Sequence, residues 1–261
     1  MRKNSSEIIF VGTASGKTSA ERNHSSFLIQ TKSHNLLVDA GDGIAKALLQ
    51  HKIKFTGIDS ILFTHYHADH FSGIAALITQ MKLAGRKKPI ILFTHKNLIS
   101  SLESLLNSVY MFKDTLGFKL DIIGFEFDKD IYIKKSLSFT AKKNSHIVQK
   151  ENLKKYPKKN FVSSSILFKI DSQNLFYTSD IGNKDDLYLF ERYKLDYVIS
   201  EAAHVKVEEL MEFYNKTNPE KLFITHYDDS AEAELKKWHR QLNANDRKRI
   251  IISYDGLDFQ L

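Results

Sequence analysis

The chain has 261 residues, of which 42% are hydrophobic and 26% are charged, which is ordinary for a globular protein with a sizeable core. It contains no cysteine, which excludes disulfides and thiolate metal sites, so any bound metal must be held by nitrogen and oxygen atoms. No apolar stretch approaches the length of a membrane span, and no signal-peptide core precedes the first predicted strand, so we expect a cytoplasmic protein without a membrane partner. The formal net charge of +7 favours an anionic partner, but by itself it is a weak indication of nucleic acid.

Short apolar runs alternate with helical patterns along most of the chain, and this alternation predicts an α/β layered fold. We find no internal repeat, no low-complexity tract and no interdomain linker, and we therefore expect one domain over residues 1–261. An acidic turn is expected to join the strands at 121–127 and 136–140. The predicted strands cover residues 8–11, 26–29, 35–39, 61–63, 89–93, 121–127, 136–140, 165–170, 175–178, 197–199, 222–224, 249–252 and 257–259, and the predicted helices cover residues 44–49, 71–81, 96–110, 184–192, 205–214 and 231–242.

Four metal-ligand residue types fall within six positions after the predicted strand at 61–63, namely His65, His67, Asp69 and His70. Neutral imidazoles and a carboxylate are the usual ligands of zinc and similar divalent ions. Alternate residues of an extended segment point to the same side, so His65 and His67 present two nitrogens together. A polar turn that happens to be rich in histidine is the alternative, but four such residues at this spacing favour a metal site.

This run resembles the His-x-His-x-Asp-His signature of the metallo-β-lactamase-fold hydrolases. The resemblance implies an αββα four-layer sandwich and three further ligands downstream, a His, then an Asp that bridges two metal ions, then a last His. Residues of these types follow in that order, each near the end of a predicted strand: His146, Asp180 and His226. Ser179 stands where the family has a glycine before the bridging Asp.

By resemblance, each of two metal ions has three ligands of its own and shares Asp180. All-nitrogen and oxygen ligation suits zinc and also admits manganese or iron. Two such ions would share a hydroxide nucleophile at neutral pH, and Asp69 is expected to be catalytic as well as a ligand. The implied ligands are His65, His67 and His146 for one ion, and Asp69, His70 and His226 for the other.

Two further stretches resemble ribonuclease Z and related phosphodiesterases, Arg22–Ser26 and Tyr254–Gly256. A third stretch, Ser200–His204, departs from the pattern because it replaces the family's His-Glu-Ala-Thr element, but it places His204 just past a predicted strand. In those enzymes a His near this third stretch assists the departing oxygen, and imidazole has a pKa suited to delivering that proton. We therefore expect His204 to be catalytic, with a structural histidine at a helix start as the alternative. The Pro and Lys that precede Arg-Asn in many ribonuclease Z sequences are absent, and no Gly/Pro-rich arm for the tRNA elbow is evident.

The predicted function is a two-metal phosphodiesterase of ribonuclease Z type that acts on RNA or nucleotide phosphodiesters. A thioester or lactone hydrolase of the same fold is one alternative, and a non-catalytic nucleic-acid or nucleotide sensor is another. The natural substrate, with tRNA and a cyclic nucleotide among the candidates, and a homodimeric assembly are left open by the sequence.

Two other features admit two interpretations each. Asp39 is expected either to orient a metal-bound histidine or to serve as a turn or helix-capping residue. The segment Lys134–Lys159 carries nine lysines against one acid, Glu151, and is expected to be either a solvated loop or a basic rim that holds a phosphate backbone.

Overall fold

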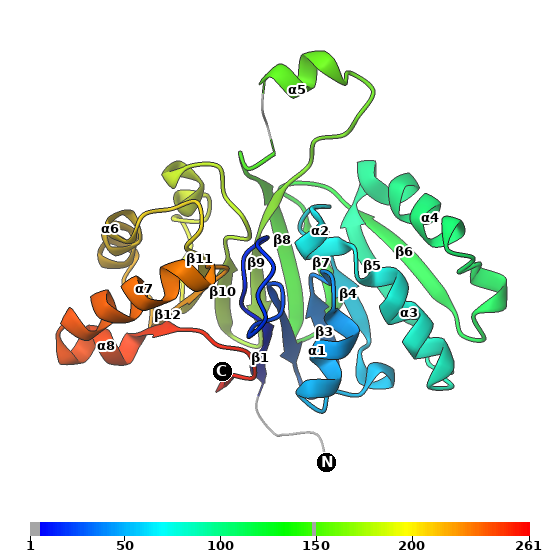
Figure 1. Cartoon of the computed structure of the whole chain (residues 1–261), viewed down its shortest axis with the longest axis horizontal. Coiled ribbons are helices and arrows are strands. Elements are labelled where there is room, and N and C mark those ends of the chain that lie inside the picture. Colours follow the sequence, from blue (N-terminus) through cyan, green and yellow to red (C-terminus); the bar gives the residue numbers. More distant parts are fainter. Residues whose placement is uncertain (1–5, 148–149) are drawn as a thin grey trace. The chain divides into compact units, whose positions relative to one another are not determined.

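The computed structural model describes residues 6–147 and 150–261. Its contacts divide the chain into two compact units, Met1–Glu126 with Asp255–Leu261, and Phe127–Tyr254. Each unit is built on one seven-stranded mixed sheet with helices (Figure 1). The single domain expected from the sequence stays a prediction. In the described ranges, every helix is too short or too polar to cross a membrane.

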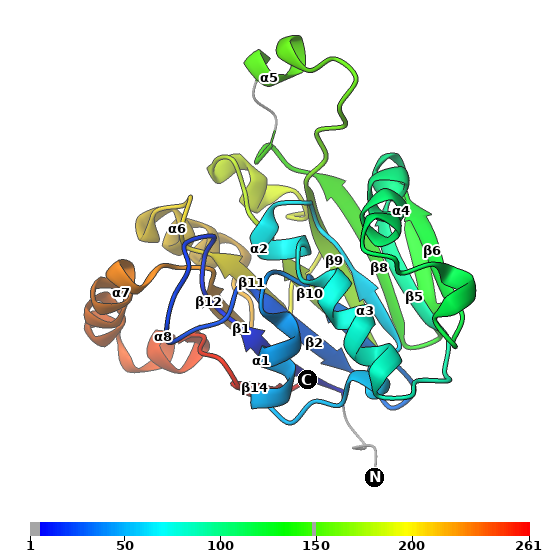
Figure 2. The ribbon, with the colours of Figure 1, turned by 45° about the vertical axis from the view of Figure 1, so that its right-hand side comes forward.

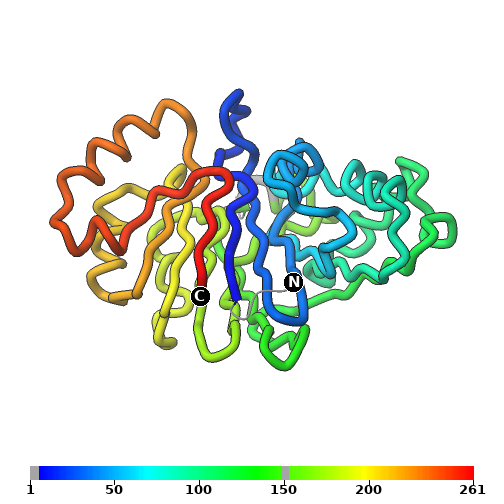
Figure 3. The backbone as a smooth tube through the Cα atoms, turned by 90° about the horizontal axis from the view of Figure 1, so that it is seen from below, coloured from blue at the N-terminus to red at the C-terminus, as the bar shows by residue number. Residues whose placement is uncertain are grey.

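The sheet of the first unit has the order β14-β1-β2-β3-β4-β5-β6. Strands β14 to β3 pair antiparallel, and β3 to β6 pair parallel. Figure 3 shows the C-terminal strand beside the N-terminal one, where Glu7 pairs with Gln260. Because β3 and β4 run parallel, the residues that follow them emerge at one edge of the sheet. The strands are β1 (Glu7–Gly12), β2 (Ser26–Gln30), β3 (Asn35–Val38), β4 (Ser60–Leu62), β5 (Ile90–His95), β6 (Leu120–Phe125) and β14 (Asp258–Gln260).

Helices α1, α3 and α4 of the first unit each bury apolar side chains. Helices α1 and α3 lie side by side (Figure 2), and Leu77, Ile78 and Met81 recur at helical spacing and are fully buried in the same core as Leu37 and Ile61. This packing fixes the edge from which the loops after β3 and β4 emerge. The helices are α1 (Ile44–Gln50), α2 (Ala68–Phe71), α3 (Ile74–Leu83) and α4 (Ile99–Ser108).

The sheet of the second unit has the order β13-β12-β11-β10-β9-β8-β7. Strands β7 to β10 pair antiparallel, and β10 to β13 pair parallel. Strands β8, β10, β11 and β12 therefore all point the same way, and their carboxyl ends share one edge. The strands are β7 (Asp130–Lys134), β8 (Leu137–Lys143), β9 (Ser164–Ile170), β10 (Gln173–Tyr177), β11 (Tyr197–Glu201), β12 (Lys221–Thr225) and β13 (Ile250–Ile252).

Helices α6 and α7 cover the second sheet through a buried core in which Leu210 and Phe213 meet Val198 and Leu222. Residues 184–188 form a 3-10 helix in place of the longer helix predicted at 184–192. The helices are α5 (Lys150–Lys155), α6 (Val207–Thr217), α7 (Asp229–Gln241) and α8 (Ala244–Arg249).

Three local predictions were wrong. The acidic turn predicted between 121–127 and 136–140 contains strand β7, whose neighbour is β8, while β6 belongs to the other sheet. The helix predicted over 71–81 is split into α2 and α3 at Gly73, where a Cβ atom would lie 2.0 Å from the Gly41 carbonyl oxygen. Helix α8 was missed because its residues are polar on every side and show no apolar period.

Candidate metal centre

The loop after β4 and the short helix α2 gather four ligand-type side chains in the first unit. The ring of His65 is fully buried, and its centroid lies 4.7 Å from that of His67 and 4.2 Å from that of His70. Asp69 places its Oδ2 atom 3.4 Å from the His70 Nε2 atom. The residues that the sequence predicts as one cluster are therefore together, with Asp69 and His70 on α2 and not on a turn.

Asp39, the residue after β3, supports this cluster through hydrogen bonds. Its Oδ2 atom accepts a hydrogen bond from His70 Nδ1 at 2.8 Å, and its Oδ1 atom accepts one from the Thr64 N–H at 2.8 Å. A carboxylate on Nδ1 fixes the tautomer and leaves Nε2 to a metal ion. Helix α1 is capped by Gly43 instead, so of the two interpretations the contacts support the orienting one.

Replacing Asp39 with Asn should weaken metal binding by about 10–100-fold, because a neutral amide holds the His70 imidazole less well. Chelator competition measures the affinity directly. Asp59→Asn is the matched control, since Asp59 is also buried and accepts the Asn35 N–H, but contacts no histidine among the described residues. Equal affinity of Asp39→Asn and wild type would contradict the orienting role.

Tyr66 lies between the two histidines in sequence but supports the loop by packing. Its ring stacks on Phe71 at a centroid distance of 3.7 Å, and its hydroxyl contacts the Thr94 hydroxyl at 2.8 Å. Burial raises the pKa of Tyr66, so the phenol stays neutral at physiological pH.

In the second unit, Asp180 lies between two histidines. Its Oδ2 atom is 3.5 Å from His146 Nε2, and its Oδ1 atom is 3.2 Å from His226 Nε2. The carboxylate is buried, and each of its oxygens is turned to a different imidazole. A carboxylate placed in this way could contact two metal ions, and all three residues follow strands whose carboxyl ends share an edge.

Two of the loop residues at this edge have a left-handed backbone. Ser179 has φ of 54° and His226 has φ of 51°, a region that favours glycine. The left-handed backbone at Ser179 thus explains why the family has a glycine at this position. Strain of this kind persists only where the surrounding structure enforces it, here the paired strands that precede each loop.

Asp186 joins the loop that carries His146 to the loop that carries Asp180. Its Oδ2 atom accepts hydrogen bonds from the Ser145 N–H at 3.0 Å, the Ser145 hydroxyl at 2.7 Å and the Gly182 N–H at 2.9 Å. A Cβ atom on Gly182 would lie 2.5 Å from Ser145 Oγ and 2.6 Å from the Ser145 carbonyl oxygen. The two loops therefore approach too closely for any side chain at this position.

Gly182→Ala should force these loops apart, lower the melting temperature and weaken metal binding, because His146 and Asp180 move with them. Gly57→Ala is the matched control, since a Cβ atom there would lie 3.9 Å from the Lys54 Cβ atom, an ordinary contact. Thermal unfolding and metal titration compare the two variants. A Gly182→Ala protein that binds metal like the control would show that loop spacing is unimportant.

Glu201, the last residue of β11, is a site residue that was not recognised in the sequence. Its buried carboxylate accepts hydrogen bonds from the N–H groups of Ile181 at 3.0 Å, Ala203 at 2.7 Å and His204 at 2.8 Å. It also contacts His204 Nδ1 at 3.0 Å. The available signal was an acidic residue at the end of an apolar strand, three positions before a histidine.

His204 lies close to the other histidines of its unit while staying open to solvent. Its side chain is 42% exposed, and its ring centroid is 4.9 Å from that of His146 and 6.1 Å from that of His226. Glu201, His204 and His226 are close enough to form a third candidate metal group. Because the Glu201 oxygens already accept three backbone N–H bonds, we assign Glu201 to positioning His204.

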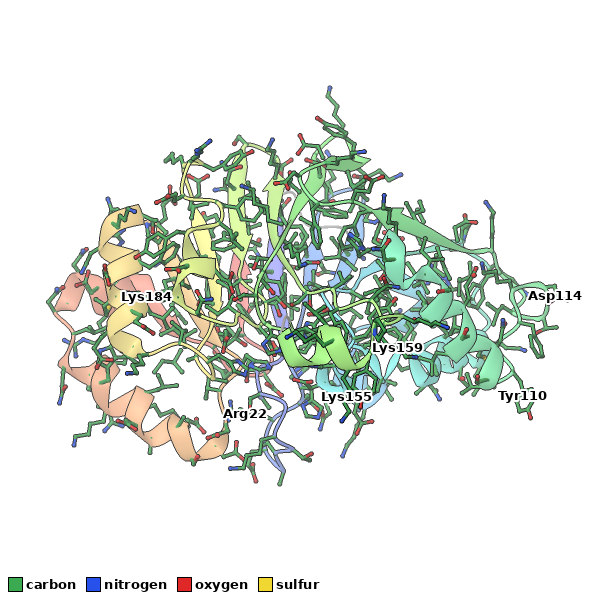
Figure 4. The ribbon with its side chains drawn as sticks, turned by 90° about the horizontal axis from the view of Figure 1, so that it is seen from above. Arg22, Tyr110, Asp114, Lys155, Lys159 and Lys184 are labelled. Carbon is green, nitrogen blue, oxygen red and sulfur yellow. The ribbon has the colours of Figure 1, made fainter. Side chains whose placement is uncertain are left out.

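The basic segment Lys134–Lys159 is divided among several environments. Lys142 donates to the Leu189 carbonyl at 2.9 Å and lies 5.2 Å from the Phe190 ring centre, so it has a structural role. Lys155 and Lys159 lie on the stretch between β8 and β9 and are exposed (Figure 4). Binding of nucleic acid by this segment stays a prediction.

The donor set fits divalent metal ions. Imidazole nitrogens and carboxylate oxygens are the ligands that zinc, manganese and iron take, and the histidines and aspartates form clusters consistent with a binuclear metal site. The outer contacts of Asp39 and Asp186 add the supporting shell that such ligands need.

Known structures of the same fold identify the class of protein. The metallo-beta-lactamase fold protein YhfI from Bacillus subtilis matches with a TM-score of 0.76, 19% identity and coverage of 98% of this chain and 99% of that one. Human tRNase Z, short form, matches with a TM-score of 0.72, 16% identity and coverage of 97% and 98%. The chain therefore has the metallo-β-lactamase fold, as predicted, and carries the histidines and aspartates of a metal-dependent hydrolase.

The family follows from the sequence comparison. The family model of the anti-Pycsar protein Apyc1 matches residues 6–246, and the chain belongs to this family. The Apyc1 protein of Bacillus phage BSP38 is 28% identical over 94% of this chain and 98% of its own length. Ribonuclease Z of Pyrococcus abyssi is 36% identical, but over 40% of this chain and 34% of its own length. The prediction of a metal-dependent phosphodiesterase related to ribonuclease Z is thus confirmed.

Proposed function

We propose that this phosphodiesterase acts on cyclic nucleotides. The observation that carries the proposal is the family match over residues 6–246, because proteins of the Apyc1 family degrade cyclic nucleotide signals. The sequence similarity to ribonuclease Z of Pyrococcus abyssi covers 40% of the chain. This similarity and the exposed lysines near α5 are the two reasons to keep RNA as a second candidate substrate.

We assign the seven ligands as the family signature orders them, with Asp180 shared between two ions. The support within each unit is the cluster on the loop after β4 and the two-sided contact of Asp180. Two divalent ions bound there would supply Lewis acidity and activate water at neutral pH. The assignment is His65, His67 and His146 for one ion, and Asp69, His70 and His226 for the other.

His204 is assigned as the donor of the proton that the leaving oxygen needs. Glu201 accepts the Nδ1–H of the imidazole, so the proton to be transferred is on Nε2. When the P–O bond breaks, this Nε2 proton passes to the departing alkoxide. The other proton stays on Nδ1, where it is hydrogen-bonded to Glu201. The partial exposure of His204 is consistent with access to a substrate.

A metal-reconstituted activity screen tests the proposal. The substrates are 3′,5′-cyclic nucleotides, bis(4-nitrophenyl) phosphate, a 3′-extended tRNA and a thioester. We expect cyclic nucleotides to open to mononucleotides with the highest kcat/KM. Preferred cleavage of the tRNA would favour the second candidate, and hydrolysis of the thioester alone would return the chain to the carbonyl-hydrolase branch.

A further inference from the structure

A cavity of about 280 Å³ lies in the second unit, between the turn that follows β11 and helix α7. We call it the Trp238 pocket, after the residue of α7 that lines it together with Ala231 and Leu235. Ala202 and Val205 line it from the turn. The first turns of helices α6 and α7 contribute residues to the pocket, and the two helices lie next to each other in Figure 1.

The walls of the pocket suit a flat apolar ring. Val205 and Leu235 are 6% and 5% exposed, so they form part of a fixed apolar core, and the partly buried Trp238 packs against that core. An indole face stacks well on another aromatic ring. The volume is just under the usual range for sites that hold drug-sized ligands, roughly 300–1,000 Å³, so a single ring system fits better than a whole dinucleotide.

The charged residues at the pocket limit the chemical class of the ligand further. Glu208 and Glu234 contribute two carboxylates, and Lys206 contributes one ammonium, all of them exposed. Two carboxylates disfavour a phosphate and favour a ring that offers N–H donors. An uncharged heteroaromatic ring with amino or imino groups meets both conditions. We propose that the Trp238 pocket binds a nucleobase.

The pocket shares its turn with the proposed catalytic histidine. Ala202 and Val205 line the pocket, while Ala203 and His204, between them, bond to Glu201 through their N–H groups. A base in the pocket therefore contacts the same short segment that holds His204. Its effect on turnover rests on the proposed function, whereas its binding does not. The base belongs either to the substrate or to a separate nucleoside.

The chain reports on this pocket without labelling, because Trp238 is its single tryptophan. Titration of metal-free protein with adenosine, guanosine and cytidine should quench the tryptophan fluorescence saturably, and ribose 5-phosphate should not. Ala231→Leu fills the pocket while keeping the reporter and suits a helix. We expect this variant to weaken nucleoside binding by about 5–150-fold, since a stacked base contributes about 1–3 kcal/mol. Glu234→Gln should weaken the binding of guanosine and adenosine, because it removes a carboxylate that can accept hydrogen bonds from their N–H groups.

The outcomes separate binding from catalysis. No saturable quenching by any nucleoside, or equal quenching in Ala231→Leu, would overturn the proposal, and neither result depends on metal or turnover. With the loaded enzyme, competition between free nucleoside and a cyclic nucleotide, and a raised KM in Ala231→Leu, would identify the substrate's own base. A change in kcat without competition would identify a separate nucleoside.

Discussion

Asp180→Ala is expected to abolish hydrolysis of every phosphodiester and to lower the bound metal. Asp180 presents one oxygen to His146 and the other to His226, at 3.5 and 3.2 Å. Its removal takes away a negative charge and the carboxylate that both proposed ions would share. The remaining imidazoles are neutral and cannot balance the charge of two dications. Metal content by elemental analysis and turnover of a nitrophenyl diester give the two readouts.

Asp185→Ala is the control for this prediction. Asp185 lies five residues further along the chain and is exposed on the 3-10 helix after the Asp180 loop, so its loss changes net charge equally. It should keep its metal and its activity. His67→Ala, on the loop of the first unit, should resemble Asp180→Ala. If Asp180→Ala retained full activity after chelation and dialysis, the two-metal mechanism would be wrong.

The order of the candidate ligands was inferred from the family signature, and the directions of the strands agree with that order. Asp180, His204 and His226 each come after one of the strands β10, β11 and β12, and parallel strands place their carboxyl ends on one edge. Apolar runs mark such strands clearly in a sequence. Fold class was therefore within reach of local patterns and a family signature, and the same signature supplied the candidate ligand set.

The contacts that support the ligands could not be predicted in the same way. Asp39 reaches Thr64 and His70, which are 25 and 31 positions away, and Asp186 reaches Ser145, 41 positions away. Each contact depends on how two loops pack against each other, and no periodic pattern in the sequence predicts such packing. For Asp39 the sequence left open an orienting role and a turn or capping role, because a short acidic side chain can accept hydrogen bonds from backbone N–H groups in turns and caps. For Asp186 the sequence indicated no role.

The alternation of strand β7 was present in the sequence but was outweighed by its charge. Asp130, Tyr132 and Lys134 are exposed, and Ile131 and Ile133 between them are partly buried, which is the pattern of an edge strand. An acidic turn just before it drew the wrong interpretation. Charge on an edge strand protects it from pairing with other chains, so a polar strand at the end of a sheet is easily mistaken for a loop.

His204→Ala is expected to keep its metal yet slow turnover by roughly 10²–10⁴-fold, the usual contribution of a general acid. The loss should be largest for a diester with an alkoxide leaving group, such as the ribose oxygen of a cyclic nucleotide. It should shrink for a nitrophenolate leaving group, which needs little protonation. Asp180→Ala should harm both substrates, since it removes the activation of the nucleophile. Equal losses of His204→Ala on both substrates, or loss of metal, would return His204 to a structural role.

Glu201→Gln separates the positioning of His204 from general damage to the loops. The amide has the size of the carboxylate but lacks its charge, so it should leave His204 poorly oriented and reproduce the dependence on the leaving group. Asp186→Asn is matched to it, because Asp186 is also a buried carboxylate that accepts backbone N–H bonds, yet it contacts no histidine in the described ranges. It should lower stability and metal affinity without changing the ratio of the two rates.

If Glu201 acts through His204, the double variant His204→Ala/Glu201→Gln should be little slower than His204→Ala. Additive losses would show that Glu201 supports the site by another route, through the Ile181 N–H beside Asp180.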